Sequence, residues 1–192
     1  PDGSLPSTED LINNAQFLFG AGQDTGAKLL GNAMRYLAMD PELQRSVRED
    51  RKLIPALLEE VLRPEGSTKA TFRLARRNTR IGAVEIPAGK TIIVALAAAN
   101  RDPARWDDPA QFRLHRERIK EHLAFGRGAH TCIGNPLARA EIRVILNHFL
   151  DQTADITLSE THHGAPGNRE FSYEPTYIIR GLDKLHVELK PK

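Results

Sequence analysis

The chain has 192 residues, of which 40% are hydrophobic and 27% charged, and its net charge is +2. This composition is typical of a globular domain with a sizeable core, and the nearly balanced charge argues against a nucleic-acid-binding protein. A single cysteine excludes an intramolecular disulfide, and the longest apolar run, residues 92–99, is far shorter than the ~20 residues of a membrane helix. No signal peptide is recognisable, so we expect a cytoplasmic protein with no membrane segment in this chain.

The first predicted element is a long helix from about residue 8 to residue 38. Apolar residues recur there at helical spacing, and a Ser-Thr pair ahead of two acidic residues is a typical helix start. Residues 19–26 contain three glycines, each of which costs ~1 kcal/mol relative to alanine in a helix. Small residues would let a flat ligand lie against the backbone, and the Thr25 hydroxyl can bond the Ala21 carbonyl and open a groove. A glycine-kinked core helix is the alternative.

Two shorter helices are predicted next, over residues 42–50 and 53–63, and Pro64 is expected to stop the second one. Glu60 and Arg63 lie three residues apart and therefore share a face of that helix. Such spacing usually indicates a solvent-exposed ion pair, which contributes ~0.5 kcal/mol to stability.

A β-rich region is predicted over residues 71–96, where residues 84–86 and 91–96 should form a hairpin around a Pro-Ala-Gly turn. A polar coil marked by prolines follows over residues 100–109. Three short strands are predicted towards the C-terminus, and the last two should pair: residues 156–158, 177–182 and 185–189. The sequence therefore predicts a mainly α fold with small β-sheets (α+β), and we expect one domain over residues 1–192.

The only cysteine, Cys132, lies in the glycine-rich stretch 125–134, FGRGAHTCIG. Glycines that can adopt a positive φ and admit a flat ligand surround it: Gly126, Gly128 and Gly134. Asn135 is predicted to cap a helix that has Pro136 at its first position and ends near residue 151. The thiol would then lie beside a helix N-terminus, where the thiolate, the form that binds metals, is favoured. A buried structural cysteine is the alternative.

Three motifs resemble those of cytochromes P450, in the same order and at similar separations. The stretch 125–134 matches the heme-binding pattern Phe-x-x-Gly-x-(His/Arg)-x-Cys-x-Gly, and residues 21–25 resemble the oxygen-binding pattern (Ala/Gly)-Gly-x-(Asp/Glu)-Thr. Glu60 and Arg63 resemble the Glu-x-x-Arg element. The resemblance covers nearly the whole chain but only the C-terminal half of the P450 fold, so we expect the N-terminal half of that fold to be missing.

The resemblance implies a heme b (iron protoporphyrin IX) site in which Cys132 is the axial iron ligand. Phe125 would pack near the sulfur, and Arg73 and His130 would face the propionates. The residues that it places at the cofactor are Ala21, Gly22, Arg73, Phe125, Gly126, His130, Cys132 and Gly134.

The resemblance also implies roles for residues around the cofactor. Thr25 would hydrogen-bond dioxygen while Asp24 relays protons, because neighbours on a helix point ~100° apart and cannot share one position. Glu60, Arg63 and Arg116 would form a buried structural network, in which the loss of one member costs several kcal/mol. The substrate-pocket candidates are Lys69, Ala70, Thr71, Phe72, Tyr177, Ile178 and Ile179, although core strand residues would show the same pattern.

The implied activity is that of a heme-thiolate monooxygenase, which inserts one oxygen atom from O2 into a small organic substrate. By analogy we expect a natural-product tailoring hydroxylase. Two alternatives remain: a peroxide-driven heme-thiolate enzyme, against which the Asp24-Thr25 pair argues, and a catalytically incomplete P450-like fragment or interaction protein. None of the seven histidines has the spacing of a zinc site, and Cys132 has no second thiol partner.

Electrons are expected from a ferredoxin or similar donor, since no flavin or iron-sulfur motif occurs in the sequence. Basic residues near the cysteine could attract an acidic donor, or could simply form a solvated face: Arg118, Arg127, Arg139 and Arg143. We expect a monomer, with O2 and a small molecule as further partners and no nucleic acid.

Overall fold

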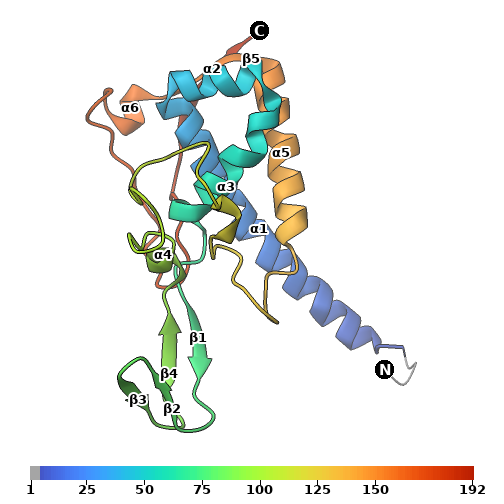
Figure 1. Cartoon of the computed structure of the whole chain (residues 1–192). Coiled ribbons are helices and arrows are strands. Elements are labelled where there is room, and N and C mark those ends of the chain that lie inside the picture. The colour runs from blue at the N-terminus through green and yellow to red at the C-terminus, as the bar shows by residue number, and fades with distance from the viewer. Residues whose placement is uncertain (1–4) are drawn as a thin grey trace.

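The computed structural model describes residues 5–192. In chain order its elements are α1 (Thr8–Met39), α2 (Pro41–Glu49), η1 (Arg51–Leu53), α3 (Ile54–Glu65), β1 (Thr71–Leu74), β2 (Thr79–Ile81), β3 (Val84–Ile86), β4 (Thr91–Val94), α4 (Leu96–Ala99), η2 (Ile119–Glu121), α5 (Asn135–Gln152), β5 (Thr153–Leu158), α6 (Glu160–His163) and β6 (Val187–Pro191). α1 runs diagonally through the molecule, and α2, α3 and α5 pack against it (Figure 1). Its N-terminal half extends away from the other elements.

α1 is one continuous helix of 32 residues, close to the predicted bounds. Ser7 caps it: the Ser7 side chain accepts a hydrogen bond from the Asp10 amide at 3.1 Å, and the Asp10 carboxylate accepts one from the Ser7 amide at 3.2 Å. This reciprocal capping box satisfies amides that would otherwise lack partners at the helix start.

The glycine-rich middle of α1 keeps its helical path. The Thr25 hydroxyl donates to the Ala21 carbonyl oxygen at 2.7 Å, as predicted. A Cβ atom added at Gly20, Gly22 or Gly26 would meet no side chain or neighbouring segment within 4 Å among the described residues. The glycines therefore leave open space along this part of the helix.

The hydrophobic core lies where the C-terminal half of α1 meets α2, α3, α5 and β5. Its fully buried apolar side chains include Leu37, Val47, Ile54, Leu57, Leu146, Leu150 and Ile156. Each side chain of this size contributes ~1.5–3 kcal/mol when it leaves water, so the core fixes how these helices cross.

Residues 5–192 contain three two-stranded antiparallel sheets, β1–β4, β2–β3 and β5–β6. The predicted hairpin of residues 84–86 with 91–96 is wrong, because β3 pairs with β2 and β4 pairs with β1. Gly82, with φ of +57°, makes the tight turn between β2 and β3, and Gly89, with φ of +84°, leads the chain back to β4. Glycine adopts this left-handed backbone without strain, so both turns form without a steric penalty.

The predicted pairing of the two C-terminal strands is also wrong. β6 pairs with β5, with Leu189 opposite Ile156. Residues 177–182 form no strand and contact their neighbours through isolated bridges, one of which joins Thr68 to Ile179. This irregular segment consequently lies beside the chain that leaves α3.

Two helix ends differ from the predictions. α3 continues through Pro64 to Glu65, since a proline in the last turn removes only one helical hydrogen bond. α5 is capped by Gly134 and begins at Asn135, so Asn135 is not the cap. The Asn135 side chain instead accepts a hydrogen bond from Arg139 within the first turn.

Candidate functional site

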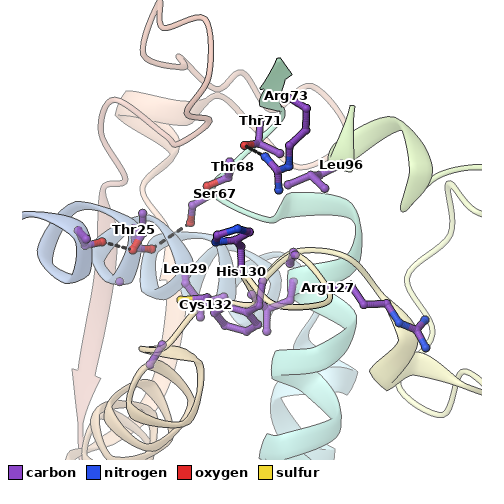
Figure 2. A pocket seen from close by; sticks show the side chains of 17 residues that line it. Thr25, Leu29, Ser67, Thr68, Thr71, Arg73, Leu96, Arg127, His130 and Cys132 are labelled. Carbon is purple, nitrogen blue, oxygen red and sulfur yellow. Dashed lines mark hydrogen bonds between the residues drawn. The ribbon is translucent and has the colours of Figure 1, made fainter. Parts of the chain in front are cut away.

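A hollow of about 310 Å³ lies between α1, the segment after α3 and the loop that carries Cys132. Its lining residues are Ala21, Thr25, Gly26, Leu29, Leu62, Ser67, Thr68, Thr71, Arg73, Leu96, Ala124, Phe125, Gly126, Arg127, His130, Cys132 and Ala138. Figure 2 shows the side chains of Thr25, Arg73 and Cys132 around it, whereas Arg127 extends away. Residues that are far apart in the sequence thus converge on one site.

The lining suits a flat, mostly apolar group that carries a metal and acidic substituents. Leu29 and Leu62 supply apolar wall, and Cys132 is an exposed free thiol. The Arg73 guanidinium bonds the Thr71 hydroxyl at 3.2 Å, and no carboxylate within residues 5–192 pairs with it. A thiolate ligand with an unpaired cation at the rim fits a heme and its propionates.

The loop around Cys132 is shaped by its own backbone. The Cys132 amide donates to the Phe125 carbonyl oxygen at 2.9 Å, which closes the loop on itself. Gly126 and Gly128 have φ of +68° and +86°, as expected for glycines in this stretch. Gly134 has an ordinary φ of −78°, so the expectation of a positive φ there is wrong; a Cβ added to it would lie 3.8 Å from the Cys132 sulfur.

Asp24 and Thr25 lie differently around the hollow. Thr25 lines it, and its carbonyl oxygen accepts a hydrogen bond from the Ser67 hydroxyl at 3.0 Å. Asp24 lies outside the lining and forms an ion pair with Lys28, whose ammonium is also 3.0 Å from a Glu174 carboxylate oxygen. Burial lowers the pKa of Lys28, but hydrogen bonds to these two carboxylates outweigh that effect and raise it overall. Sequence reasoning missed Lys28, although its place four residues after Asp24 is a usable signal.

Glu60, Arg63 and Arg116 meet in the protein interior. Arg63 donates to both carboxylate oxygens of Glu60, at 3.0 and 2.9 Å, and the Arg116 Nε donates to Glu60 at 3.0 Å. Glu60 and Arg63 are 0% exposed, which excludes a solvated pair. Arg63 also donates to the carbonyl oxygens of Asn100 and Pro109, so the network holds the coil of residues 100–109 against α3.

A second buried carboxylate, Glu59, was missed by sequence reasoning. It accepts hydrogen bonds from Arg139 on α5 and from His122, just before the cysteine loop. Burial would raise the pKa of Glu59, but these donors hold it at about 2, so the group is charged. Its position next to Glu60 in a buried helix was the available signal.

Several predicted residues lie outside the lining of the main hollow. Gly22 lines another hollow, of about 500 Å³, between α1 and α5. The other predicted residues outside the lining are Asp24, Gly134, Lys69, Ala70, Phe72, Tyr177, Ile178 and Ile179. The substrate-pocket candidates among them still lie together, because the Lys69 amide donates to the Ile178 carbonyl oxygen at 2.7 Å and the Phe72 and Tyr177 rings stack at 6.3 Å.

The model of one protein family, Cytochrome P450, matches residues 1–154. The chain belongs to the cytochrome P450 family. Heme b, held by a cysteine thiolate, is the cofactor of that family, and the family supports the predicted fold class.

Relatives of this P450 come from several bacteria. It is 36% identical to Cytochrome P450 144 of Mycobacterium tuberculosis over 90% of this chain and 38% of the relative. It is 38% identical to Cytochrome P450 monooxygenase PikC of Streptomyces venezuelae over 97% of this chain and 43% of the relative. The chain thus spans less than half the length of these relatives.

Solved P450 structures share the fold closely. Mycobacterium marinum cytochrome P450 CYP150A6 in its substrate-free form matches with a TM-score of 0.96 and 50% identity, over 100% of this chain and 47% of that one. The predicted C-terminal half of the P450 fold is confirmed by this match. Across residues 5–192, no helix combines the length and apolarity that crossing a membrane requires.

Proposed function

We propose that the protein is a heme-thiolate monooxygenase that inserts one oxygen atom from O2 into a small organic substrate. The observation that carries the proposal is the convergence of Cys132, Thr25 and Arg73 on one hollow. When bound, the heme supplies reductive activation of O2: two electrons and two protons are consumed, one oxygen atom enters the substrate and the other leaves as water.

In this proposal the loop and its neighbours hold the cofactor. Cys132 would bind the heme iron through its sulfur, and Phe125 would pack beside that sulfur. Arg73 and His130, which line the same hollow, would donate hydrogen bonds to the heme propionates. Ala21 and Gly126 line the hollow, and their small size would let the backbone approach a flat group. Gly22 and Gly134 lie just outside that lining, and we propose that they act by keeping the adjacent backbone free of side-chain bulk.

Thr25 and Asp24 handle protons. The Thr25 hydroxyl donates to the Ala21 carbonyl oxygen, so its own oxygen keeps lone pairs that can accept a hydrogen bond from a group in the hollow. Asp24 delivers protons from solvent by moving its side chain away from Lys28, which now pairs with it. Glu174 can hold the Lys28 ammonium while Asp24 is turned away.

The proposed substrate class is a small natural product that this enzyme tailors. Support comes from similar proteins: HmtT, 33% identical, is described as involved in himastatin biosynthesis, and HmtN, 34% identical, as a post-tailoring hydroxylase of that biosynthesis. The residues proposed to contact the substrate are Lys69, Ala70, Thr71, Phe72, Tyr177, Ile178 and Ile179.

A ferredoxin or similar acidic protein is the proposed electron donor. Arg118 pairs with Glu121, and Arg139 pairs with Glu59. Within residues 5–192, no carboxylate pairs with Arg127 or Arg143, so these two cations remain available for a donor's acidic surface. The single-domain organisation and the monomeric state stay predictions.

The absorption spectrum of the reduced protein with carbon monoxide tests the proposal, using protein expressed from the complete gene. A red-shifted Soret band of the thiolate type should appear in the wild type and vanish in Cys132→Ala. Val144→Ala, an exposed position on α5, serves as the control and should keep the band. A Cys132→Ala variant with an unchanged band would overturn the ligand assignment.

A further inference from the structure

The Glu59 side chain is buried at the junction of three segments. It projects from α3 and is 5% exposed. Arg139, on α5, donates to its Oε2 atom at 2.8 Å, and the His122 Nε2 atom lies 3.0 Å from the same oxygen. One carboxylate therefore links α3, α5 and the chain that enters the cysteine loop.

The His122 ring ties this carboxylate to the backbone. Its Nδ1 atom accepts a hydrogen bond from the Ala124 amide at 3.2 Å, so the ring proton is on Nε2 and is donated to Glu59. The Leu123 amide donates to the Asn100 side chain at 2.7 Å. The three residues before Phe125 are thus fixed from both sides, and Glu59 selects the histidine tautomer that allows it.

Arg139 extends the same network to the Phe125 side chain. The guanidinium carbon of Arg139 lies 4.6 Å from the centroid of the Phe125 ring, which is the geometry of a cation–π contact. The Phe125 carbonyl oxygen in turn accepts the Cys132 amide at 2.9 Å. Two nitrogens of the Arg139 guanidinium donate to the Glu59 carboxylate. Glu59 therefore fixes the cation that packs on the Phe125 ring, and Phe125 in turn holds the Cys132 amide.

We propose that Glu59 is a positioning residue of the heme site, which holds His122 and Arg139 so that Phe125 and the Cys132 sulfur keep one orientation. Glu59 lies outside the lining of the hollow and would act through His122 and Arg139. The inference rests on the proposed function, since it needs Cys132 as the ligand. If Glu59 were an ordinary buried ion pair, its loss would lower stability without altering the sulfur's environment.

The test follows the thiolate-type band of the reduced, carbon-monoxide-bound holoprotein over time. In Glu59→Gln the band should convert to the shorter-wavelength form of a lost thiolate on the order of tenfold faster than in wild type, because hydrogen bonds to a charged group are removed. Arg139→Lys keeps the positive charge but loses the paired guanidinium hydrogen bonds to Glu59 and the cation–π contact with Phe125. The band should therefore convert faster than in wild type, but by less than in Glu59→Gln. The second readout is the midpoint potential of the heme, which should be higher in Glu59→Gln than in wild type.

Glu65→Gln is the matched control, because Glu65 is also buried, at 6% exposed, and pairs with three arginines that do not contact Glu59, His122 or Arg139: Arg35, Arg101 and Arg180. Its conversion rate should stay within about twofold of wild type. Equal rates in Glu59→Gln and wild type, or equal acceleration in Glu65→Gln, would overturn the positioning role. If Glu59→Gln does not fold, the conversion rate of Arg139→Lys is compared with those of wild type and Glu65→Gln instead. A wild type without the band would refute the proposed function itself.

Discussion

In the proposed function the Thr25 hydroxyl, which lines the hollow, takes part in proton transfer. Thr25→Ala should lower product formation by about 100-fold, because a positioned proton-transfer group contributes 10²–10⁴-fold. Electron-donor oxidation should fall much less, so that reducing equivalents are lost without product. The measurement is product formed per donor oxidised.

Thr25→Ser is the control for that substitution, since serine keeps the hydroxyl that donates to the Ala21 carbonyl. It should retain most of the yield. Equal yields in the alanine and wild-type proteins would show that protons reach the site by another route, and Asp24 would then lose its assigned role as well.

At the scale of elements, the cysteine loop depends on glycine at particular positions. Gly128 has φ of +86° and open space around it, so Gly128→Ala should lose ~1–2 kcal/mol of unfolding free energy from backbone strain alone. Gly134→Ala is the counterpart: φ is −78° there, so the loss should be smaller, ~0.5 kcal/mol, and should come from alanine being a poorer helix N-cap than glycine. Urea unfolding of both variants measures the difference, and equal losses would contradict a backbone origin.

The sequence predicted correctly those elements that are determined by residues close together in the chain. The long helix from Ser7 onwards and the loop at Cys132 follow from capping residues, periodicity and glycine spacing, all within a few positions of each other. The pairing of β3 with β2 was missed because strand partners depend on turn geometry that a run of apolar residues does not specify. The helix ends at Pro64 and Gly134 were misplaced by one or two residues, because a proline in the last turn removes only one helical hydrogen bond and because Gly134, not Asn135, caps α5.

Across the whole molecule, the missed features are contacts between distant segments. Lys28 meets Glu174, and Glu59 meets His122 and Arg139, only after the chain has folded. The family motifs named Cys132 and Thr25, but motif spacing carries no information about which cations neutralise neighbouring carboxylates. Such pairs decide how the stability of the molecule responds to pH.

Glu59 makes that response measurable. Its pKa is lowered from 4.5 to about 2, so the folded state binds fewer protons than the unfolded state as the pH falls below 4.5. The stabilisation, on the order of 3 kcal/mol, is complete above pH 4.5 and is lost as the pH falls towards 2, with about 2 kcal/mol gone at pH 3.

Glu59→Gln should therefore be less stable than wild type at pH 7, while the gap between the two proteins narrows by about 2 kcal/mol at pH 3. Urea unfolding at both pH values gives the comparison. Glu42→Gln, which changes an exposed glutamate on α2, should leave the wild-type pH dependence intact. A constant gap between Glu59→Gln and wild type from pH 7 to pH 3 would mean that Glu59 is not the depressed carboxylate, because a glutamine cannot titrate and the difference must follow the proton that it no longer binds.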